Sequence, residues 1–567
     1  MKISGKNEIL LDDILVGDVW ICSGQSNMEW TVSNSNHAEE EIANAGYPGI
    51  RLFEVPHNVQ LMPVEDIPSG EWQACSPETV GNFSAVGYFF GREIHREVEV
   101  PVGLISTNWG GTNVETWTSR EMSATVPEMK EAVEEIDQMD IEQLAEKMKQ
   151  ERKALLESLG KLESGMVDGR AVWAAADLDL SKWKPMEVPG LWEGQGLRGV
   201  DGVVWFRRTI ELTEAQAAGP VILHLGAIDD SDRTWVNGTE VGSMKNAYNK
   251  AREYMVAAGI MKAGVNTLVV RVEDTGGGGG FWSEPEVMQV QTAAGALPLA
   301  GEWLYRVSAE SLKVGVQVAV HPNSKPTLLY NGMINPLLNY SVLGAIWYQG
   351  EANAGRAYAY RTRFPNMIRD WRDKWGNQEM GFYFVQLANF MEVEELPSES
   401  AWAELREAQA MTLALPKTGM AVTIDIGEAG DIHPRNKQDV GRRLALAALH
   451  GTYGRELVYS APVFKSLKVE GAAAVVEFDP MGSELVVRDK YGYVKGFAVA
   501  GEDRVFHWAR GRAEGNRVIL TSDMVPAPVA VRYAWANNPD DANLFNPEGL
   551  PVGPFRTDDW PGITMEK

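Results

Sequence analysis

Short runs of apolar residues that end at small polar residues recur along the chain and predict buried β-strands. We expect strands at residues 19–22, 102–105, 342–347, 382–385 and 421–424. Apolar residues at helical spacing predict a helix over residues 83–97. A second helix is predicted after His433-Pro434, with the proline in its first turn. This alternation of strands and helices is typical of an α/β domain with a parallel sheet.

Two other patterns interrupt the α/β alternation. Residues 129–162 are rich in Glu, Lys, Ala, Leu and Met, which predicts a helical connector. Between about residues 171 and 290, short strand-like runs alternate with turn signals such as Asn237-Gly238 and predict a β-sandwich. We therefore divide the chain into a first part of an α/β core (1–119), a helical connector (120–170), an inserted β-sandwich (171–290), a second part of the core (291–456) and a C-terminal β-rich region with its tail (457–567).

Composition and charge exclude several classes of function. The 567 residues are 44% apolar and 23% charged, as in globular proteins, and a net charge of −26 disfavours nucleic acid and anionic membranes as partners. No apolar run approaches the ~18 residues of a membrane helix. Two cysteines and eight histidines without paired spacing predict neither a metal site nor a disulfide framework. The first residues lack an apolar signal segment, so the sequence predicts no location; a periplasmic or secreted location would fit if the N-terminus is truncated.

Four polar segments follow predicted strands: residues 24–28, 108–112, 347–353 and 431–434. Ligand sites of open α/β sheets lie at the carboxyl ends of the strands, so these segments are candidates for one site. Ser26 would stand at the start of a helix, where backbone N–H groups favour the anion formed when a serine attacks an ester. Asp431 and His433 are the residue types that activate a serine. Each segment alone is more often an ordinary turn, cap or polar loop.

In this order, the segments resemble the sialate O-acetylesterase family of the SGNH hydrolase superfamily. The resemblance covers nearly the whole chain, through residues 17–28, 103–112, 329–334, 346–351, 431–446, 532–535 and 555–560. It implies an SGNH-type (flavodoxin-like) three-layer parallel-sheet hydrolase core and a serine esterase that removes O-acetyl groups from sugars without a metal or cofactor. Residues 188–192, 202–208 and 235–238 are similar to a galactose-binding-like jelly roll, which supports a sugar-linked substrate by analogy.

The resemblance also implies roles for individual residues. Ser26 would be the nucleophile, His433 the base and Asp431 the carboxylate that orients the base. The backbone N–H groups of Ser26 and of Gly111 (or its neighbour Gly110), with the side chain of Gln349, would form the oxyanion hole. Gln25, Trp109 and Glu351 would line the substrate site, and Glu351 is expected to brace its loop rather than act as an acid.

Two departures from the family pattern leave questions open. The superfamily usually spaces its catalytic pair as Asp-x-x-His, whereas this chain has Asp431-x-His433, so Asp425 is the alternative carboxylate. Full-length relatives also carry a β-rich segment ahead of the nucleophile block, and here only about 16 residues precede Gly17. The C-terminal β-rich region is therefore expected to lack part of its usual partner.

Two other functions compete with the esterase hypothesis. A glycosidase would need two carboxylates, and Glu351 is the one candidate in a motif. A sugar-binding protein without catalysis would keep the pocket but not the reactive serine. Among ester substrates, the family name implies acetylated sialic acid. The net charge of −26 does not favour an anionic sugar unless local Arg or Lys residues offset it, so acetylated xylan or mannan fragments, which are neutral, are the alternative.

Overall fold

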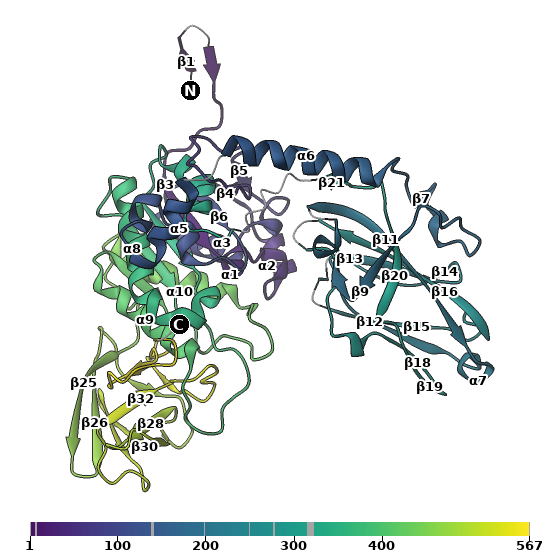
Figure 1. Ribbon diagram of the computed structural model, residues 1–567. Helices are drawn as coiled ribbons and strands as arrows, with labels where there is room; N and C mark the ends of the chain where they lie inside the picture. The colour runs from purple at the N-terminus through teal and green to yellow at the C-terminus, as the bar shows by residue number, and fades with distance from the viewer. Residues whose placement is uncertain are drawn as a thin grey trace. The chain divides into compact units, whose positions relative to one another are not determined.

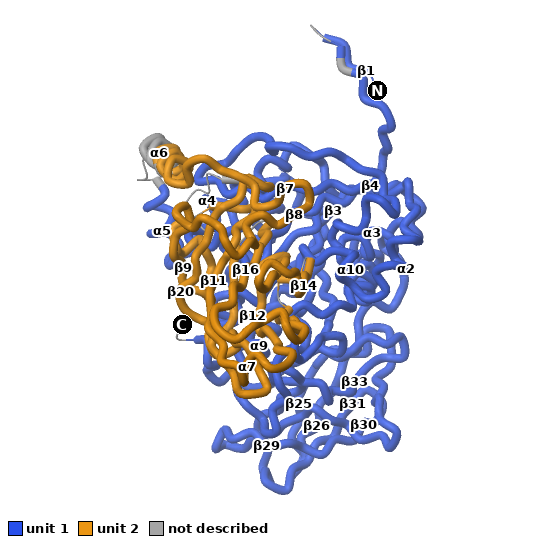
Figure 2. Tube along the Cα trace, turned by 90° about the vertical axis from the view of Figure 1, so that its right-hand side faces the viewer, with its two compact units in different colours: residues 1–139, 320–567 blue, residues 140–319 orange. Residues whose placement is uncertain are grey.

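The computed structural model describes residues 2–5, 8–137, 141–197, 199–245, 247–248, 250–275, 278–314 and 322–565. The chain forms two compact units, coloured separately in Figure 2. Unit 1 consists of Met1–Met139 and Val320–Lys567, and unit 2 of Asp140–Ala319. Unit 1 thus contains two stretches of chain that are separated in sequence by the whole of unit 2.

Unit 1 is built on a seven-stranded sheet in which every neighbouring pair is parallel except the last. The strands lie in the order β24 (Thr418–Ala421), β23 (Gly381–Val385), β22 (Gly344–Tyr348), β3 (Asp18–Gly24), β6 (Val102–Asn108), β4 (Tyr47–Glu54) and β5 (Gln73–Cys75). Four of the five predicted strands are confirmed. The fifth is displaced toward the N-terminus because Ala421 makes the last pairing and the chain then turns at Thr423. The patterns did not predict β4 or β5.

Helices cover both faces of this sheet (Figure 1): α3 (Ala85–Val98), α10 (Lys437–Gly451), α8 (Ala357–Lys374) and α9 (Ala401–Met411). Successive side chains of a strand point to opposite faces. Trp20 of β3 meets Phe90 of α3, with ring centroids 5.0 Å apart, and α3 packs against α10. Trp347 of β22 meets Phe364 of α8 at 6.2 Å, and α8 packs against α9. The result is a three-layer arrangement with a mostly parallel central sheet. Helix α10 begins after the N-cap Asn436, so the predicted proline precedes it.

The C-terminal part of unit 1 is β-rich. One antiparallel sheet contains β25 (Val463–Glu470), β26 (Ala473–Asp479), β31 (Arg517–Thr521) and β30 (Arg510–Glu514), and a second contains β29 (Phe506–Trp508), β28 (Phe497–Ala500), β32 (Ala530–Tyr533) and β34 (Phe555–Arg556). Side chains from both sheets form one hydrophobic cluster, which includes Val476, Phe497, Leu520 and Tyr533. This region therefore has its own core.

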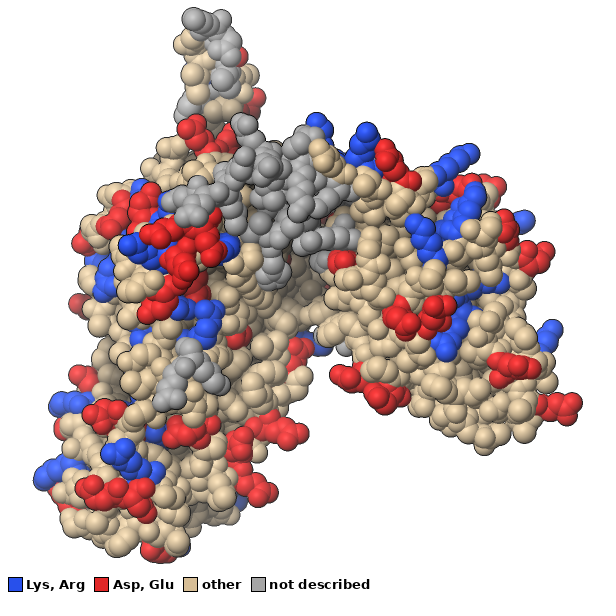
Figure 3. All heavy atoms as spheres, viewed as in Figure 1, with Lys and Arg blue, Asp and Glu red and all other residues tan. Residues whose placement is uncertain are grey.

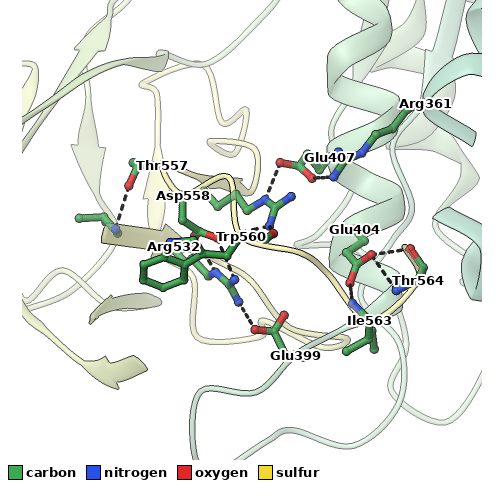
Figure 4. Close-up of polar contacts among 12 residues, drawn as sticks. Arg361, Glu399, Glu404, Glu407, Arg532, Thr557, Asp558, Trp560, Ile563 and Thr564 are labelled. Carbon is green, nitrogen blue, oxygen red and sulfur yellow. Dashed lines mark hydrogen bonds and ion pairs between the residues drawn. The ribbon is translucent and has the colours of Figure 1, made fainter. Parts of the chain in front are cut away.

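The C-terminal tail runs from the β-rich region back to α9 (Figure 4). Arg532 of β32 pairs with Asp558 at 2.9 Å and with Glu399 at 2.8 Å, and the Arg532 and Asp558 side chains are 3% and 1% exposed. Glu404 of α9 accepts hydrogen bonds from the backbone N–H groups of Ile563 (2.6 Å) and Thr564 (3.2 Å). These contacts attach the tail to the helical layer that covers β22.

Unit 2 is built on two large antiparallel sheets whose side chains share a hydrophobic core. Its longest pair is β11 (Val200–Leu212) with β16 (Gly264–Asp274). β20 (Gly301–Val307) pairs with β11 and buries Trp303 and Tyr305 in unit 2, so the predicted boundary at residue 290 is too early. The apolar alternation of β20 matches that of the sandwich, and no change in composition marks the true boundary. The predicted connector contains α4 (Arg120–Ser123), α5 (Pro127–Asp137) and α6 (Ile141–Leu159).

Charged side chains of both signs are interspersed on the described surface of each unit in the face that Figure 3 shows. The excess of acidic residues is therefore spread rather than gathered in one place on that face. None of the described helices combines the length and the apolar character that crossing a bilayer requires.

Candidate active site

The carboxyl ends of three neighbouring strands are level with one another. Gly24 of β3 is in register with Asn108 of β6 and with Tyr348 of β22, so three of the four polar segments meet at one edge of the sheet. The approach is close: Gly24 has a φ of +143°, and a Cβ there would lie 2.1 Å from the Tyr348 carbonyl oxygen. Glycine is thus required at this position, where the chain leaves the strand and turns toward Ser26.

Ser26 and His433 are in direct contact. Ser26 begins α1 (Ser26–Glu29), and His433 lies in the loop before α10. The Ser26 Oγ is 2.8 Å from His433 Nε2. Asp431 Oδ1 accepts the backbone N–H of His433 at 2.8 Å and lies 3.4 Å from its Nδ1, while the Trp30 ring stacks on the imidazole at 5.3 Å and 14°. The imidazole is thus held with Nε2 toward the serine and Nδ1 toward a carboxylate.

The surroundings of His433 favour its uncharged form. Burial lowers the pKa of His433 below the ordinary histidine value, and the positive charge of Lys437 acts in the same direction. The carboxylates of Asp431 and Glu29 raise that pKa but do not reverse the shift. A neutral imidazole is the form that can accept a proton from a serine hydroxyl, so His433 suits a general base near neutral pH.

The structure distinguishes between the two candidate carboxylates. Both oxygens of Asp425 accept hydrogen bonds from Arg443 of α10, at 2.6 and 2.7 Å, and the Arg443 side chain is 5% exposed. Asp425 is therefore engaged with a buried guanidinium, whereas Asp431 lies against His433. The geometry favours Asp431 as the carboxylate that orients the base.

The backbone N–H groups of Ser26 and Gly111 are candidates for an oxyanion hole. Within the described part of the chain, no protein acceptor takes the backbone N–H of Ser26 or of Gly111. Gly110 adjoins the nucleophile, since a Cβ at Gly110 would lie 3.3 Å from Ser26 Cβ. Its N–H, however, donates to Glu29 Oε2 at 2.6 Å. The donors of Ser26 and Gly111 are thus free, and that of Gly110 is held by a carboxylate.

Gln349 does not occupy the position expected for an oxyanion donor. Its side chain is fully buried, and Nε2 donates to the Thr112 carbonyl at 3.0 Å and to Asn353 Oδ1 at 2.7 Å. Its Oε1 accepts from the Tyr360 hydroxyl at 2.9 Å. Both amide hydrogens are engaged, so Gln349 braces two loops against each other. This corrects the expectation that the Gln349 side chain donates a hydrogen bond in the oxyanion hole.

Gln25 and Glu351 also act as braces in this structure. Gln25 is 3% exposed, and its Oε1 accepts the Ala352 N–H at 3.2 Å, which attaches the nucleophile turn to the next loop. The expected contact of Gln25 with substrate is therefore not supported, because burial removes it from the surface. Half-buried Glu351 accepts a hydrogen bond from Asn27 at 2.6 Å, in keeping with the bracing role expected of it.

The patterns did not identify two residues beside Trp109. The partly exposed Trp109 ring stacks on His57, with centroids 4.0 Å apart and 5° between the planes. His57 Nε2 is 3.1 Å from Glu29 Oε1. His57 follows β4, which was not predicted, so no local signal marked it. Glu29 stands one helical turn after Ser26, and that spacing could have indicated it.

Comparison with known proteins shows the family to which this chain belongs. The family model of the carbohydrate esterases described as sialic acid-specific acetylesterases matches residues 16–144 and 313–450, the stretches on either side of most of unit 2. A solved carbohydrate acetylesterase from Xanthomonas citri is 33% identical, covers 98% of this chain and 84% of its own, and superposes with a TM-score of 0.61. The chain belongs to the sialic acid-specific acetylesterase family of carbohydrate esterases.

Curated relatives of this esterase include mammalian enzymes. The sialate O-acetylesterase of Mus musculus is 24% identical over 580 residues, which cover 96% of this chain and 77% of the mouse protein. That of Homo sapiens is 22% identical over 588 residues, which cover 97% of this chain and 77% of the human protein. The protein is thus a carboxylic ester hydrolase, and the matches extend over both units.

Proposed function

We propose that this esterase removes O-acetyl groups from sugars by serine catalysis on an SGNH-type core, with Ser26 as nucleophile, His433 as base and Asp431 as the orienting carboxylate. The observation that carries the proposal is the 2.8 Å contact between Ser26 Oγ and His433 Nε2, two residues that are 407 positions apart in the chain. A contact of this kind between a hydroxyl and a neutral imidazole, oriented by a third group, is what serine esterases require.

The reaction proceeds in two steps. The Ser26 Oγ attacks the acetyl carbonyl carbon while His433 Nε2 takes the hydroxyl proton. The carbonyl oxygen gains the negative charge and is stabilised by the free N–H groups of Ser26 and Gly111. Collapse breaks the bond to the sugar oxygen, which leaves with the proton from His433. Water, activated by the same imidazole, then hydrolyses the acetyl-Ser26 ester and releases acetate.

A second question is which acetylated sugar is the substrate. Family membership puts O-acetylated sialic acid first among the proposed substrates. A specific observation favours neutral sugars, such as acetylated xylan or mannan oligosaccharides: the side chains of Glu29 and Asp431 beside the Ser26–His433 pair are 37% and 27% exposed, and these carboxylates would repel an anionic sugar. Arg435, an exposed residue two positions after His433, is the nearby cation that a sialate carboxylate would need.

Two measurements test the proposal. Ser26→Ala should abolish acetate release from 4-nitrophenyl acetate and from acetylated sugars, and a fluorophosphonate probe should label the unmodified protein at Ser26 and not the variant. Full activity in Ser26→Ala would refute the assignment. Acetate and reducing sugar are measured together, because a glycosidase would release the latter. Comparison of O-acetylated sialic acid with acetylated xylo- and manno-oligosaccharides then decides the sugar.

We further propose that unit 2 is a jelly roll of the galactose-binding type. Its two large antiparallel sheets and their shared hydrophobic core, with Val204, Phe206, Leu223 and Trp303 among the core residues, support this assignment. Binding of acetylated oligosaccharides to the isolated Ser26→Ala protein, mapped by protection of unit 2 from hydrogen exchange, tests whether it contacts sugar.

A further inference from the structure

Asn27, the residue after the nucleophile, joins several parts of the site through its side chain. Its Nδ2 donates to Glu351 Oε1 at 2.6 Å and to the backbone carbonyl of Ile432, next to His433, at 3.0 Å. Its Oδ1 accepts a hydrogen bond from Lys437 Nζ. Asn27 is 1% exposed, so water does not compete for these contacts. One amide therefore links the serine turn, the loop of Glu351, the loop of His433 and the start of α10.

Lys437, the partner of Asn27, is a buried ammonium group. It is 0% exposed, and its Nζ lies 5.7 Å from the centre of the Trp30 ring and 5.3 Å from that of Tyr348. An ammonium over aromatic faces is stabilised by their electron density, more so when it is desolvated. The Trp30 ring also stacks on His433, so the lysine and the imidazole pack against one aromatic side chain.

The charges that face Lys437 come from two segments: the turn that begins at Glu351, and the loop before α10 that carries Glu428 and Asp431. Glu351, Asp431 and Glu428 raise the pKa of Lys437, but burial dominates and lowers it to about 7. Burial also raises the pKa of Glu351, which Lys437 and Asn27 oppose. A buried lysine costs free energy that a methionine of similar length would not, because methionine carries no charge to desolvate. Packing alone therefore does not explain why a lysine stands at position 437.

We propose that Lys437 is a positioning residue of this active site: through Asn27 it holds the serine turn, the His433 loop and Glu351 in one arrangement, and its charge disfavours the imidazolium form of His433. This inference rests on the proposed Ser26–His433 mechanism. Lys437 reaches the reaction through Asn27 and His433. Misplacement of a catalytic group by about 1 Å can cost on the order of 10²-fold in rate.

A purely structural lysine would behave differently in one measurable respect. Its loss would lower Tm and the yield of folded enzyme, but it would leave the pH dependence of the folded enzyme unchanged. A positioning lysine that acts on His433 has a second signature. Removing its positive charge stabilises the imidazolium, which raises the pKa of His433 and moves the acid limb of kcat/KM to higher pH.

The experiment compares Lys437→Met and Lys437→Gln with Arg442→Met, a control on the same helix whose side chain is 41% exposed and pairs with Asp439. We expect Lys437→Met to lower kcat on the order of 10²-fold with KM changed less than about threefold. Lys437→Gln retains a donor for Asn27 and should lose less kcat, yet show the same shift of the acid limb. Arg442→Met should match the unmodified enzyme in both.

Asn27→Ala supplies a second route to the same answer. It removes the residue through which Lys437 acts and leaves the lysine in place, so kcat should fall as in Lys437→Met. The double variant should lose no more kcat than the more impaired of the two single variants, because Asn27 and Lys437 act as a unit. Full kcat in folded Lys437→Met with an unshifted acid limb would overturn the inference. If neither Lys437 variant folds, full kcat in Asn27→Ala overturns it and a matching loss supports it. Activity in Ser26→Ala would instead refute the mechanism itself.

Discussion

Asp431→Asn is expected to slow ester hydrolysis by about 10²-fold. Asparagine retains an oxygen that can accept the His433 N–H, now accepted at 2.8 Å, so the turn that presents the imidazole is preserved. What is lost is the negative charge beside His433 Nδ1. That charge stabilises the imidazolium that forms when His433 takes the Ser26 proton, so its removal raises the barrier of the chemical step.

The magnitude follows from the 3.4 Å separation between Asp431 Oδ1 and His433 Nδ1. At an effective dielectric constant of about 20, two unit charges at that distance interact by about 5 kcal/mol. The Asp431 side chain is 27% exposed, and screening by the solvent around it reduces the interaction energy to about half. About 2–3 kcal/mol remains, which corresponds to roughly 10²-fold in rate.

The assay is kcat/KM for 4-nitrophenyl acetate as a function of pH, with Asp425→Asn as the matched control. Asp431 raises the pKa of His433, so its loss should move the acid limb to lower pH, opposite to Lys437→Met. Asp425→Asn should keep kcat/KM within about threefold but lower Tm, because it removes the charge partner of buried Arg443. A larger loss of activity in Asp425→Asn than in Asp431→Asn would refute the reasoning.

Three further predictions concern packing, pH and the tail. Gly110→Ala places a Cβ 3.1 Å from Glu29 Oε2 and 3.3 Å from Ser26 Cβ, so the nucleophile should be displaced slightly and kcat/KM should fall about tenfold or more. The control Gly355→Ala places its Cβ in open space, where no neighbouring atom lies within 4 Å, and should stay active. Equal activities of the two variants would contradict this prediction. The acid limb of kcat/KM in the unmodified enzyme should have its midpoint below the ordinary histidine pKa of about 6.5, since the pKa of His433 is lowered and protonation removes the base; a higher midpoint would count against His433. Arg532→Met leaves the 1% exposed Asp558 side chain without its main partner and should lower the unfolding free energy by about 3–5 kcal/mol, measured by calorimetry. Arg510→Met breaks a pair that is 84% exposed on both sides and should leave Tm unchanged; similar losses in both would refute the role of the tail.

The sequence alone determined the periodic and chemical parts of this protein. Buried strands of a parallel sheet are continuous apolar runs, so β3, β6, β22 and β23 were predicted from composition over a few residues. The polar segments after these strands carry the residue types of ester chemistry, and Ser26 and His433 were proposed from them. These features depend on neighbours within one element, and such information is local in the chain.

The tertiary structure alone decided which polar groups remain free for chemistry. From the sequence, Asp431 was the expected carboxylate and Asp425 the alternative. In the structure Asp431 lies against His433, whereas Arg443 of α10 takes both oxygens of Asp425. Gln349 has the donors of an oxyanion hole, yet Thr112 and Asn353 occupy them. Buried polar groups must find hydrogen-bond partners, and the partner can lie in a neighbouring element, as Arg443 does for Asp425, or 237 positions away in the chain, as Thr112 does for Gln349. Their pairing is therefore set by packing of the whole unit and is not visible in any local pattern.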